Sequence, residues 1–211
     1  MELVRNNYKE IARHYHETRQ KNFGKAWENL LRCLQGIKEG ESILDVGCGG
    51  GRLLDALESD KVSYSGVDTC EELLELARDK YPQQEFWDGD ILNLGQIPRR
   101  NFDHVTSIAL LHHLPGKDSR VKALRQLKNK VKPEGRIIVT VWNMWEQPQY
   151  RKLIWKFFLL KLIGKNKMDF GDILFDWKSP SRDRVSQRYY HAFTKRELKR
   201  IARKAKLKVK K

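Results

Sequence analysis

The middle of the chain alternates between short apolar runs and segments with the periodicity of a helix. The run at residues 43–47 stops at glycines, and the run at residues 136–142 is rich in β-branched side chains. Both features predict buried strands. Because strands that alternate with helices form a mainly parallel sheet, we expect an α/β fold with a Rossmann-like, doubly wound sheet. The expected strands are residues 43–47, 62–67, 86–90, 102–110 and 136–142, with helices at residues 52–57, 71–80 and 119–130.

Two capping boxes predict where helices begin. Thr69 is followed three residues later by Glu72, and Thr194 is followed at the same spacing by Glu197. This spacing lets a hydroxyl accept from a free backbone N–H in the first helical turn. The second box predicts a helix near the C-terminus with an apolar stripe made of Leu198, Ile201, Ala202 and Ala205.

The segments outside the expected sheet differ from it in character. Residues 8–38 are expected to be largely helical, and residues 146–187 form a long excursion without obvious strands. Residues 150–163 are apolar and aromatic with interspersed lysines, which we interpret as a lid or substrate-binding insertion; a helix on a membrane surface is the alternative. We expect a single domain with a helical segment, a cofactor-binding core, a substrate-side insertion, and a basic C-terminal helix and strand, at residues 1–40, 41–145, 146–187 and 188–211.

Length and composition fit one globular domain in a reducing compartment. The chain has 211 residues, of which 40% are hydrophobic, enough to bury a core around a sheet. Its three cysteines show no CxxC spacing, so we expect neither disulfides nor a zinc site. We find no signal peptide pattern and no apolar run near the ~20 residues of a membrane span. The expected location is the cytoplasm.

Positive charge is concentrated in the last third of the chain. The formal net charge is +15, and residues 146–211 account for +14 of it with 20 Lys and Arg against 6 Asp and Glu. Residues 41–145 have 14 basic and 16 acidic side chains, a net charge of −2. This asymmetry favours nucleic acid as a partner over a merely solvated surface, with an anionic membrane surface as a third possibility.

A glycine-rich turn follows the first expected strand and predicts the cofactor. A dinucleotide fingerprint would require a third glycine where this chain has Arg52. S-adenosylmethionine has no phosphates, and its site needs the close backbone approach that glycines permit. Asp68 and Asp90 end the next two expected strands, where they can accept from the ribose hydroxyls and the adenine amino group; either alone could be a solvated turn residue. We therefore expect S-adenosylmethionine, with S-adenosylhomocysteine as product, bound by Asp45, Gly47, Cys48, Gly49, Gly51, Arg52, Asp68, Thr69, Asp90, Ile91 and Ile108.

Motifs across most of the chain resemble a known family. The sequence ILDVGCGGGRLL at residues 43–54 and the later Gly-Val-Asp and Gly-Asp motifs resemble those of class I methyltransferases. Segments outside this core resemble the tRNA wobble-uridine (5-carboxymethyluridine) carboxyl methyltransferases, including the methyltransferase domain of the AlkB-type fusion protein. These segments lie at residues 8–19, 108–113, 141–147, 172–178 and 188–198, and the first and last of them are much more selective than the core motifs. The resemblance implies tRNA as a partner, and it also suggests a small zinc-binding activator protein.

If this resemblance holds, the methyl acceptor is a carboxylate on a modified uridine. A carboxylate is ionised at pH 7, so the site needs cations and stacking surfaces rather than a general base. A metal site at the two neighbouring histidines lacks a third ligand and is not expected. The candidates are Arg19 and Arg188 as clamps, His112 and His191 as positioning groups, and Trp142 and Tyr190 as stacking partners.

Each candidate also has a structural interpretation, and two other functions stay open. Arg19 can pair with an acidic neighbour, Trp142 can be a core residue, and either His112 or His113 can be structural. The first alternative function is a small-molecule O-methyltransferase, although a small substrate does not need such a basic C-terminal part. The second is a non-catalytic subunit that binds the cofactor or RNA.

Overall fold

The computed structural model describes residues 24–57, 61–98, 101–178 and 185–210, and these residues form two compact units. The first, called the sheet unit here, comprises the described residues up to Ile108 together with residues 126–140. The second, called the hairpin unit, comprises residues 109–125 and the described residues from Val141 onward. The predicted helical segment at residues 8–38 is described only from Gly24, so Arg19 lies outside the described residues.

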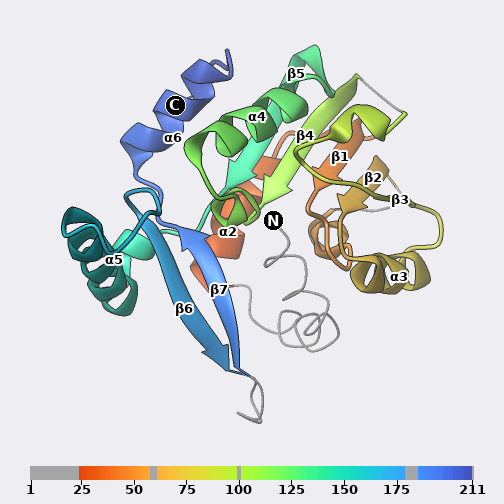
Figure 1. Cartoon of the computed structure of the whole chain (residues 1–211). Helices are drawn as coiled ribbons and strands as arrows, with labels where there is room; N and C mark the ends of the chain where they lie inside the picture. The colour runs from red at the N-terminus through yellow and green to blue at the C-terminus, as the bar shows by residue number, and fades with distance from the viewer. Residues whose placement is uncertain (1–23, 58–60, 99–100, 179–184, 211) are drawn as a thin grey trace. The chain divides into compact units, whose positions relative to one another are not determined.

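The sheet unit is built on a five-stranded parallel sheet (Figure 1). Its strands have the order β3-β2-β1-β4-β5, and every neighbouring pair is parallel. The prediction of a mainly parallel, Rossmann-like sheet is therefore confirmed. In such sheets, ligands bind at the carboxyl ends of the strands where the strand order reverses, here at β1 and β4. The strands are β1 (Ser42–Val46), β2 (Ser63–Asp68), β3 (Glu85–Asp88), β4 (Phe102–Ile108) and β5 (Val131–Thr140).

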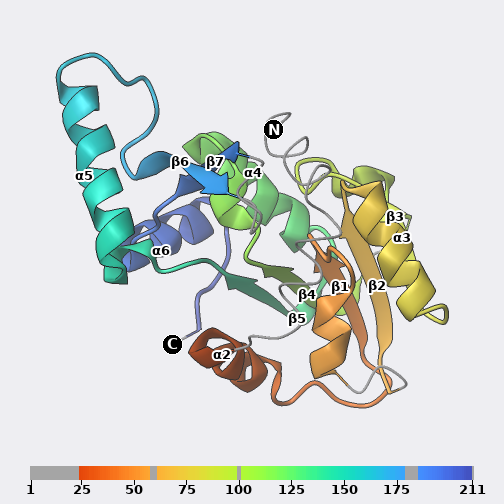
Figure 2. The ribbon, with the colours of Figure 1, turned by 90° about the horizontal axis from the view of Figure 1, so that it is seen from below.

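Apolar side chains from helices and strands form the core of the sheet unit. Leu30 and Leu34, one helical turn apart on α2 (Gly24–Leu34), pack into one cluster with Ile43 of β1 and Leu74 of α3 (Glu71–Lys80). Figure 2 shows α3 beside β3, which it contacts. Burying leucines at helical spacing against β-strands is what the sequence periodicity predicts. Two short 3-10 helices, η1 (Arg52–Ala56) and η2 (Leu94–Gln96), complete the connections.

Two local predictions for the sheet unit were wrong. The helix α3 has Cys70 rather than Thr69 at its N-cap, and no side chain caps it. The Asp68 carboxylate accepts from the backbone N–H of this N-cap residue, just before the helix. Strand β5 begins at Val131 rather than at residue 136, because the chain is already paired with β4 there despite Pro133 and Gly135.

The hairpin unit contains two strands that the sequence patterns did not reveal. Strands β6 (Asp172–Lys178) and β7 (Val185–His191) form an antiparallel pair in the segment that was predicted to lack strands. Ile173 of β6 and Tyr190 of β7 lie opposite each other and share a buried cluster with Ile154 of α5 (Pro148–Leu162). The remaining elements are η3 (Leu111–His113), the start of α4 (Lys117–Lys128), η4 (Met144–Glu146) and α6 (Lys195–Lys204).

The C-terminal helix is capped as predicted. The Thr194 hydroxyl accepts from the Glu197 backbone N–H at 3.2 Å, and Ile201 is fully buried. The strand expected after this helix was wrong, because residues 207–210 are irregular. The expected segment boundary between residues 187 and 188 falls inside β7. No helix among the described residues is long and apolar enough to cross a membrane.

Candidate active site

The glycine-rich turn leaves β1 and folds back against the end of β2. The backbone N–H groups of Gly47 and Cys48 both donate to the Val67 carbonyl, at 2.7 and 3.1 Å. Gly47, Gly49 and Gly51 have φ values of 83°, 52° and 75°, a left-handed conformation that favours glycine. A Cβ at position 49 would have its nearest neighbour 3.7 Å away, so the neighbours of Gly49 leave room around its backbone. Gly47 and Gly49 are half-buried, so part of their backbone stays accessible, as close approach to a cofactor requires.

Asp68 at the end of β2 fixes this turn. Its Oδ2 accepts from the Gly49 N–H at 2.8 Å, and its Oδ1 accepts from the Cys70 N–H at 3.0 Å. Burial raises the pKa of Asp68, and the backbone donors oppose this rise because they stabilise the carboxylate. Each oxygen retains a second lone pair, so the carboxylate can accept further hydrogen bonds from a ligand.

Asp45 has a different environment within β1. Its carboxylate accepts from the Thr106 hydroxyl at 2.6 Å and from the Tyr64 hydroxyl at 2.9 Å, which ties β1 to β4 and β2. Burial raises the pKa of Asp45 to about 6, and these two hydrogen bonds oppose the rise. The observed contacts of Asp45 thus stabilise the sheet at the base of the turn.

The other predicted cofactor residues also lie at the carboxyl ends of strands in the sheet unit. Asp90 is half-buried after β3, and its Oδ1 accepts from the Leu92 N–H at 2.8 Å. Within the described residues, its Oδ2 has no hydrogen-bond donor. Thr69 follows β2, Ile91 is buried beside Asp90, and Ile108 ends β4. Cys48 is buried in the turn and Arg52 opens η1 directly after it.

This arrangement fits S-adenosylmethionine. Three features match the groups of an amino acid, a ribose and an adenine: accessible backbone at the half-buried Gly49, spare acceptor capacity at Asp68, and an Asp90 oxygen that no donor of the described residues reaches. The sheet unit contains all three features at one edge of its parallel sheet.

A second cluster of predicted residues lies in the hairpin unit. The rings of His112 and Tyr190 are stacked with centroids 4.8 Å apart and an interplanar angle of 14°. Trp142 lies 5.3 Å from the Tyr190 ring and 5.6 Å from the His112 ring. Arg188 is buried two residues before Tyr190, so both side chains leave β7 on the same face. We call His112, Trp142, Arg188 and Tyr190 the aromatic cluster.

Burial keeps the two histidines of η3 in the neutral form. Burial lowers the pKa of His112 well below its usual 6.5, and His113 adds to this effect. Burial also lowers the pKa of His113 to about 3, with a contribution from the Arg188 charge. The Trp142 backbone N–H points at His112 Nδ1 at 3.5 Å, so Nε2 carries the proton. In the part of the chain that the structure describes, this buried Nε2 has no acceptor.

His191 lies on the opposite face of β7, in a polar network. Its Nδ1 bonds to Asp172 Oδ1 at 2.6 Å and its Nε2 bonds to Glu197 Oε1 at 3.0 Å. Arg120, also buried, donates to Asp172 at 2.9 Å and to the Tyr189 hydroxyl at 2.7 Å. Burial opposes protonation of His191, but the hydrogen bonds to Asp172 and Glu197 outweigh it and raise its pKa.

The structure therefore brings together four of the six predicted substrate-side residues. His112, Trp142, Arg188 and Tyr190 form one cluster, whereas His191 has both ring nitrogens bonded to carboxylates. Sequence reasoning missed the partners Arg120 and Asp172 of the network, and it missed Phe175, whose ring lies 5.0 Å from that of Tyr190. Apolar residues at every second position, Ile173, Phe175 and Trp177, could have revealed strand β6 from the sequence. The described residues contain no group of three His, Cys, Asp or Glu side chains that could hold a metal ion.

The fold and the glycine turn define a class I methyltransferase, the class of enzymes that uses S-adenosylmethionine. A family model described as a methyltransferase domain matches residues 15–211, and the chain belongs to this family. A structure from Methanosarcina mazei titled as a SAM-dependent methyltransferase has a similar fold, with a TM-score of 0.65 and 22% identity over 80% of each chain. A chain in a complex of the Haloferax volcanii Trm112 methyltransferase activator with a methyltransferase has a TM-score of 0.56 and 19% identity, over 69% of this chain and 66% of that one.

Curated relatives include enzymes with two kinds of substrate in their names. The tRNA (carboxymethyluridine(34)-5-O)-methyltransferase of Arabidopsis thaliana is 38% identical over 64% of this chain and 31% of the relative. The enzyme of the same name from Saccharomyces cerevisiae is 32% identical over 72% of this chain and 51% of the relative. The ubiquinone biosynthesis O-methyltransferase of Alkalilimnicola ehrlichii is 31% identical over 69% of this chain and 59% of the relative. The chain thus spans about half or less of the tRNA methyltransferases it matches.

Proposed function

We propose that this protein transfers a methyl group from S-adenosylmethionine to the carboxylate of a modified wobble uridine in tRNA and so forms a methyl ester. The observation that carries this proposal is the aromatic cluster, in which a neutral histidine and a buried arginine accompany two large rings. The likeness to two tRNA carboxymethyluridine methyltransferases supports the acceptor. The +14 net charge of residues 146–211 supports an RNA substrate.

The sheet unit would hold the cofactor, which supplies an electrophilic methyl group on a sulfonium. Asp68 would accept from the ribose hydroxyls while it keeps its bonds to the Gly49 and Cys70 N–H groups. Asp90 would accept from the adenine amino group through its Oδ2. Backbone at Gly47 and Gly49 would approach the amino-acid part, because no Cβ stands in the way.

The aromatic cluster would hold an acceptor that needs no deprotonation. A carboxylate is ionised at neutral pH, so positioning and exclusion of water do the catalytic work. Arg188 would pair with the carboxylate, and the protonated Nε2 of His112 would donate to it. Trp142, which is half-buried, would stack on the uracil ring, whereas Tyr190, predicted as a second stacking partner, is buried against His112 and would support Trp142 from behind. A histidine with a pKa well below 6.5 is a weak base, which suits this chemistry better than abstraction of a phenol proton.

Two other predicted residues would have supporting roles. Arg19 stays a candidate second clamp, although it lies outside the described residues. His191 would act as a positioning residue, because it holds β7 through Asp172 and Glu197 while Tyr190 leaves the other face of the strand.

A small-molecule O-methyltransferase is the second candidate function. The observation in its favour is the similarity to the ubiquinone biosynthesis enzyme. A phenol acceptor must lose a proton, so this function predicts a rate that rises with the ionisation of a base or of the phenol. The basic C-terminal part would then have no role in the reaction.

We also propose a small zinc-binding activator as a partner and the cytoplasm as the location. The activator is suggested by the family resemblance and by the fold shared with a chain of the Haloferax complex. Co-expression with a Trm112-type protein, followed by comparison of methyl transfer with and without it, tests this partner.

The test of function is methyl transfer from labelled cofactor to total tRNA and, separately, to a small-metabolite extract, followed by nucleoside analysis. The proposal expects label in an alkali-labile methyl ester of a wobble uridine. Arg188→Ala should lower transfer at least tenfold while leaving cofactor affinity unchanged, and the rate should show no titration of a catalytic base between about pH 6 and 8. Label only in small metabolites, or a rise of the rate with pH that disappears in His112→Gln, would favour the second candidate function.

A further inference from the structure

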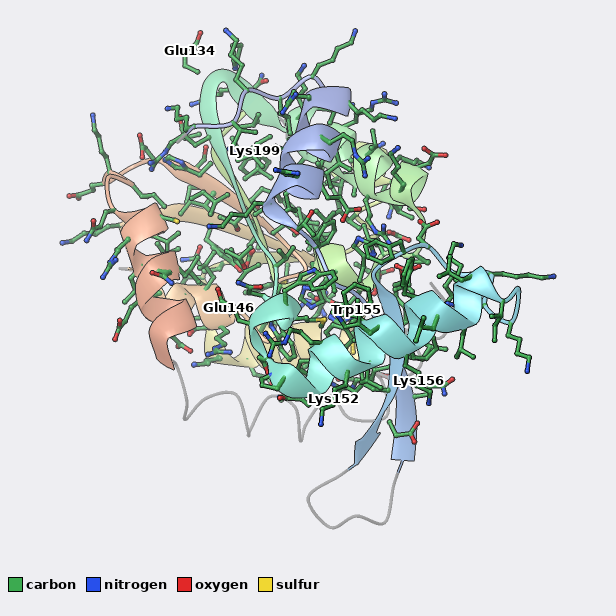
Figure 3. All side chains as sticks on the ribbon, turned by 90° about the vertical axis from the view of Figure 1, so that its left-hand side faces the viewer. Glu134, Glu146, Lys152, Trp155, Lys156 and Lys199 are labelled. Carbon is green, nitrogen blue, oxygen red and sulfur yellow. The ribbon has the colours of Figure 1, made fainter. Side chains whose placement is uncertain are left out.

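Three cationic side chains from two helices gather on the surface of the hairpin unit. Lys117 begins α4, whereas Arg200 and Lys204 lie one turn apart on α6. The positive charges of Lys204 and Arg200 are close enough to Lys117 to lower its pKa. Figures 1 and 3 show α6 beside α4, with Lys199 labelled on α6 in Figure 3. We call Lys117, Arg200 and Lys204 the cation cluster.

The fold holds the cation cluster together. Arg125 of α4 donates from Nη2 to the main-chain carbonyl of Lys204 at 3.2 Å, which links the last turn of α4 to the end of α6. Ile201 and Ala205 are buried on the inner side of α6. The two helices that carry the three cations are therefore docked against each other within the hairpin unit.

Little negative charge offsets the cation cluster. Glu197 is the one acidic residue of α6, and it turns inward to bond His191 with only 16% of its side chain exposed. Asp118 raises the pKa of Lys117 less than Lys204 and Arg200 lower it. No carboxylate of the described residues forms an ion pair with any member of the cluster. Like charges brought together in this way repel, and a bound polyanion relieves the repulsion.

We infer that Lys117, Arg200 and Lys204 form a binding site for phosphodiester groups of an RNA backbone. This inference rests on the proposed tRNA substrate and adds a place where that substrate is held. The exposed side chains of α6 are all cationic apart from its N-cap, whereas a helix that lies in a membrane surface needs an apolar face to insert. The buried position of Ile201 leaves α6 without such a face, so the site suits RNA rather than lipid.

The test compares two triple variants with equal loss of charge. The first, Lys117→Gln/Arg200→Gln/Lys204→Gln, removes the cation cluster. The control, Arg32→Gln/Lys38→Gln/Lys61→Gln, removes three exposed cations of the sheet unit. We expect the plot of log affinity for tRNA against log salt to flatten by about two to three units in the first variant, because each lost phosphate contact contributes about 0.7–0.9. The control should change this slope by less than about one unit.

A second measurement separates binding from folding. Because the first variant loses a repulsive contact, its thermal unfolding without RNA should occur at the same or a higher temperature than that of the parent. Its affinity for S-adenosylhomocysteine should be unchanged. If the parent methylates tRNA and the first variant binds tRNA with the parental slope, the site is overturned and the proposed function stands. Equal flattening in both variants, or loss of binding to anionic vesicles instead of tRNA, also overturns the site. A parent that neither binds nor methylates tRNA overturns the proposed function itself.

Discussion

Replacement of Asp68 tests the proposed cofactor site most directly. Asp68→Asn keeps the size of the side chain but removes its charge and replaces one acceptor oxygen by an NH₂ group. The amide can still accept from one of the two backbone donors, Gly49 or Cys70, but it presents a donor to the other. Asp68→Ala removes both acceptors. The two variants therefore differ in the number of backbone hydrogen bonds lost, whereas both lose the proposed ionic acceptor for the ribose.

The magnitudes follow from these contacts. A hydrogen bond to a charged acceptor contributes about 1.5–3 kcal/mol, and water that reaches the half-buried position 68 reduces the loss toward the lower limit. We expect Asp68→Asn to lower the free energy of unfolding by about 1–2 kcal/mol and Asp68→Ala to lower it by about 2–4 kcal/mol. For the cofactor, unpaired ribose hydroxyls cost about 1–3 kcal/mol. Both variants should therefore bind roughly ten- to hundredfold more weakly.

Calorimetric titration with S-adenosylhomocysteine and urea unfolding of the ligand-free protein measure the two quantities separately. Asp88→Asn is the matched control, because Asp88 pairs with Asp68 in the register of β2 and β3 but is exposed. Asp88 also contributes to the raised pKa of Asp68, so its neutralisation should leave cofactor affinity equal or slightly higher. Cofactor affinity that is unchanged in a folded Asp68→Asn variant would refute the assignment, as would equal losses in the Asp68 and Asp88 variants.

Two further predictions concern the hairpin unit. Asp172→Asn removes the shared partner of Arg120 and His191. We expect it to lower the free energy of unfolding by about 3–5 kcal/mol in urea melts at pH 6. A loss under about 1 kcal/mol would show that the network is not stabilising. The unsubstituted protein should lose stability as the pH falls through the pKa of Asp172, which lies below its usual 3.8. It should also lose stability as the pH rises through the pKa of His191, which lies above its usual 6.5. The stability of Asp172→Asn should depend less on pH. Thr194→Ala should lower the free energy of unfolding by about 1 kcal/mol and Thr194→Ser by little, since the serine hydroxyl can still accept from the first turn of α6; equal losses would show that the cap contributes nothing.

The sheet unit was predictable because its central strands β1, β2 and β4 are buried over most of their length. Residues 43–47 are almost continuously apolar, and the glycines that follow them predict a turn. The acidic residues at strand ends could be placed together because parallel strands end at one edge. What the sequence did not reveal is the second use of Asp68, which fixes the Gly49 turn and accepts from the Cys70 N–H just before α3. The spacing of Thr69 and Glu72 predicted a hydroxyl cap, but the N-cap of α3 is Cys70.

The hairpin was missed because its pattern mixes two kinds of face. Tyr189 and His191 of β7 point toward a polar network, and Arg188 and Tyr190 point toward rings, so neither face is a simple apolar row. The alternation of apolar and polar residues by which half-buried strands are recognised is therefore absent from β7. Sequence resemblance identified the string from Arg188 to His191 as functional, but it could not separate the two faces.

The alternation of β7 also explains why a stability network and a candidate substrate cluster occupy the same strand. Burying Arg188 beside neutral histidines is costly, and a free strand of this composition would not hold Tyr190 against His112. The charged hydrogen bonds of His191 on the other face fix the strand from behind, through Asp172 of β6 and Glu197 of α6. The bond from His191 Nε2 to Glu197 also turns this carboxylate away from the surface of α6, whose exposed side chains are cationic. His191 therefore supports both the aromatic cluster and α6, the helix whose cations would contact the RNA backbone.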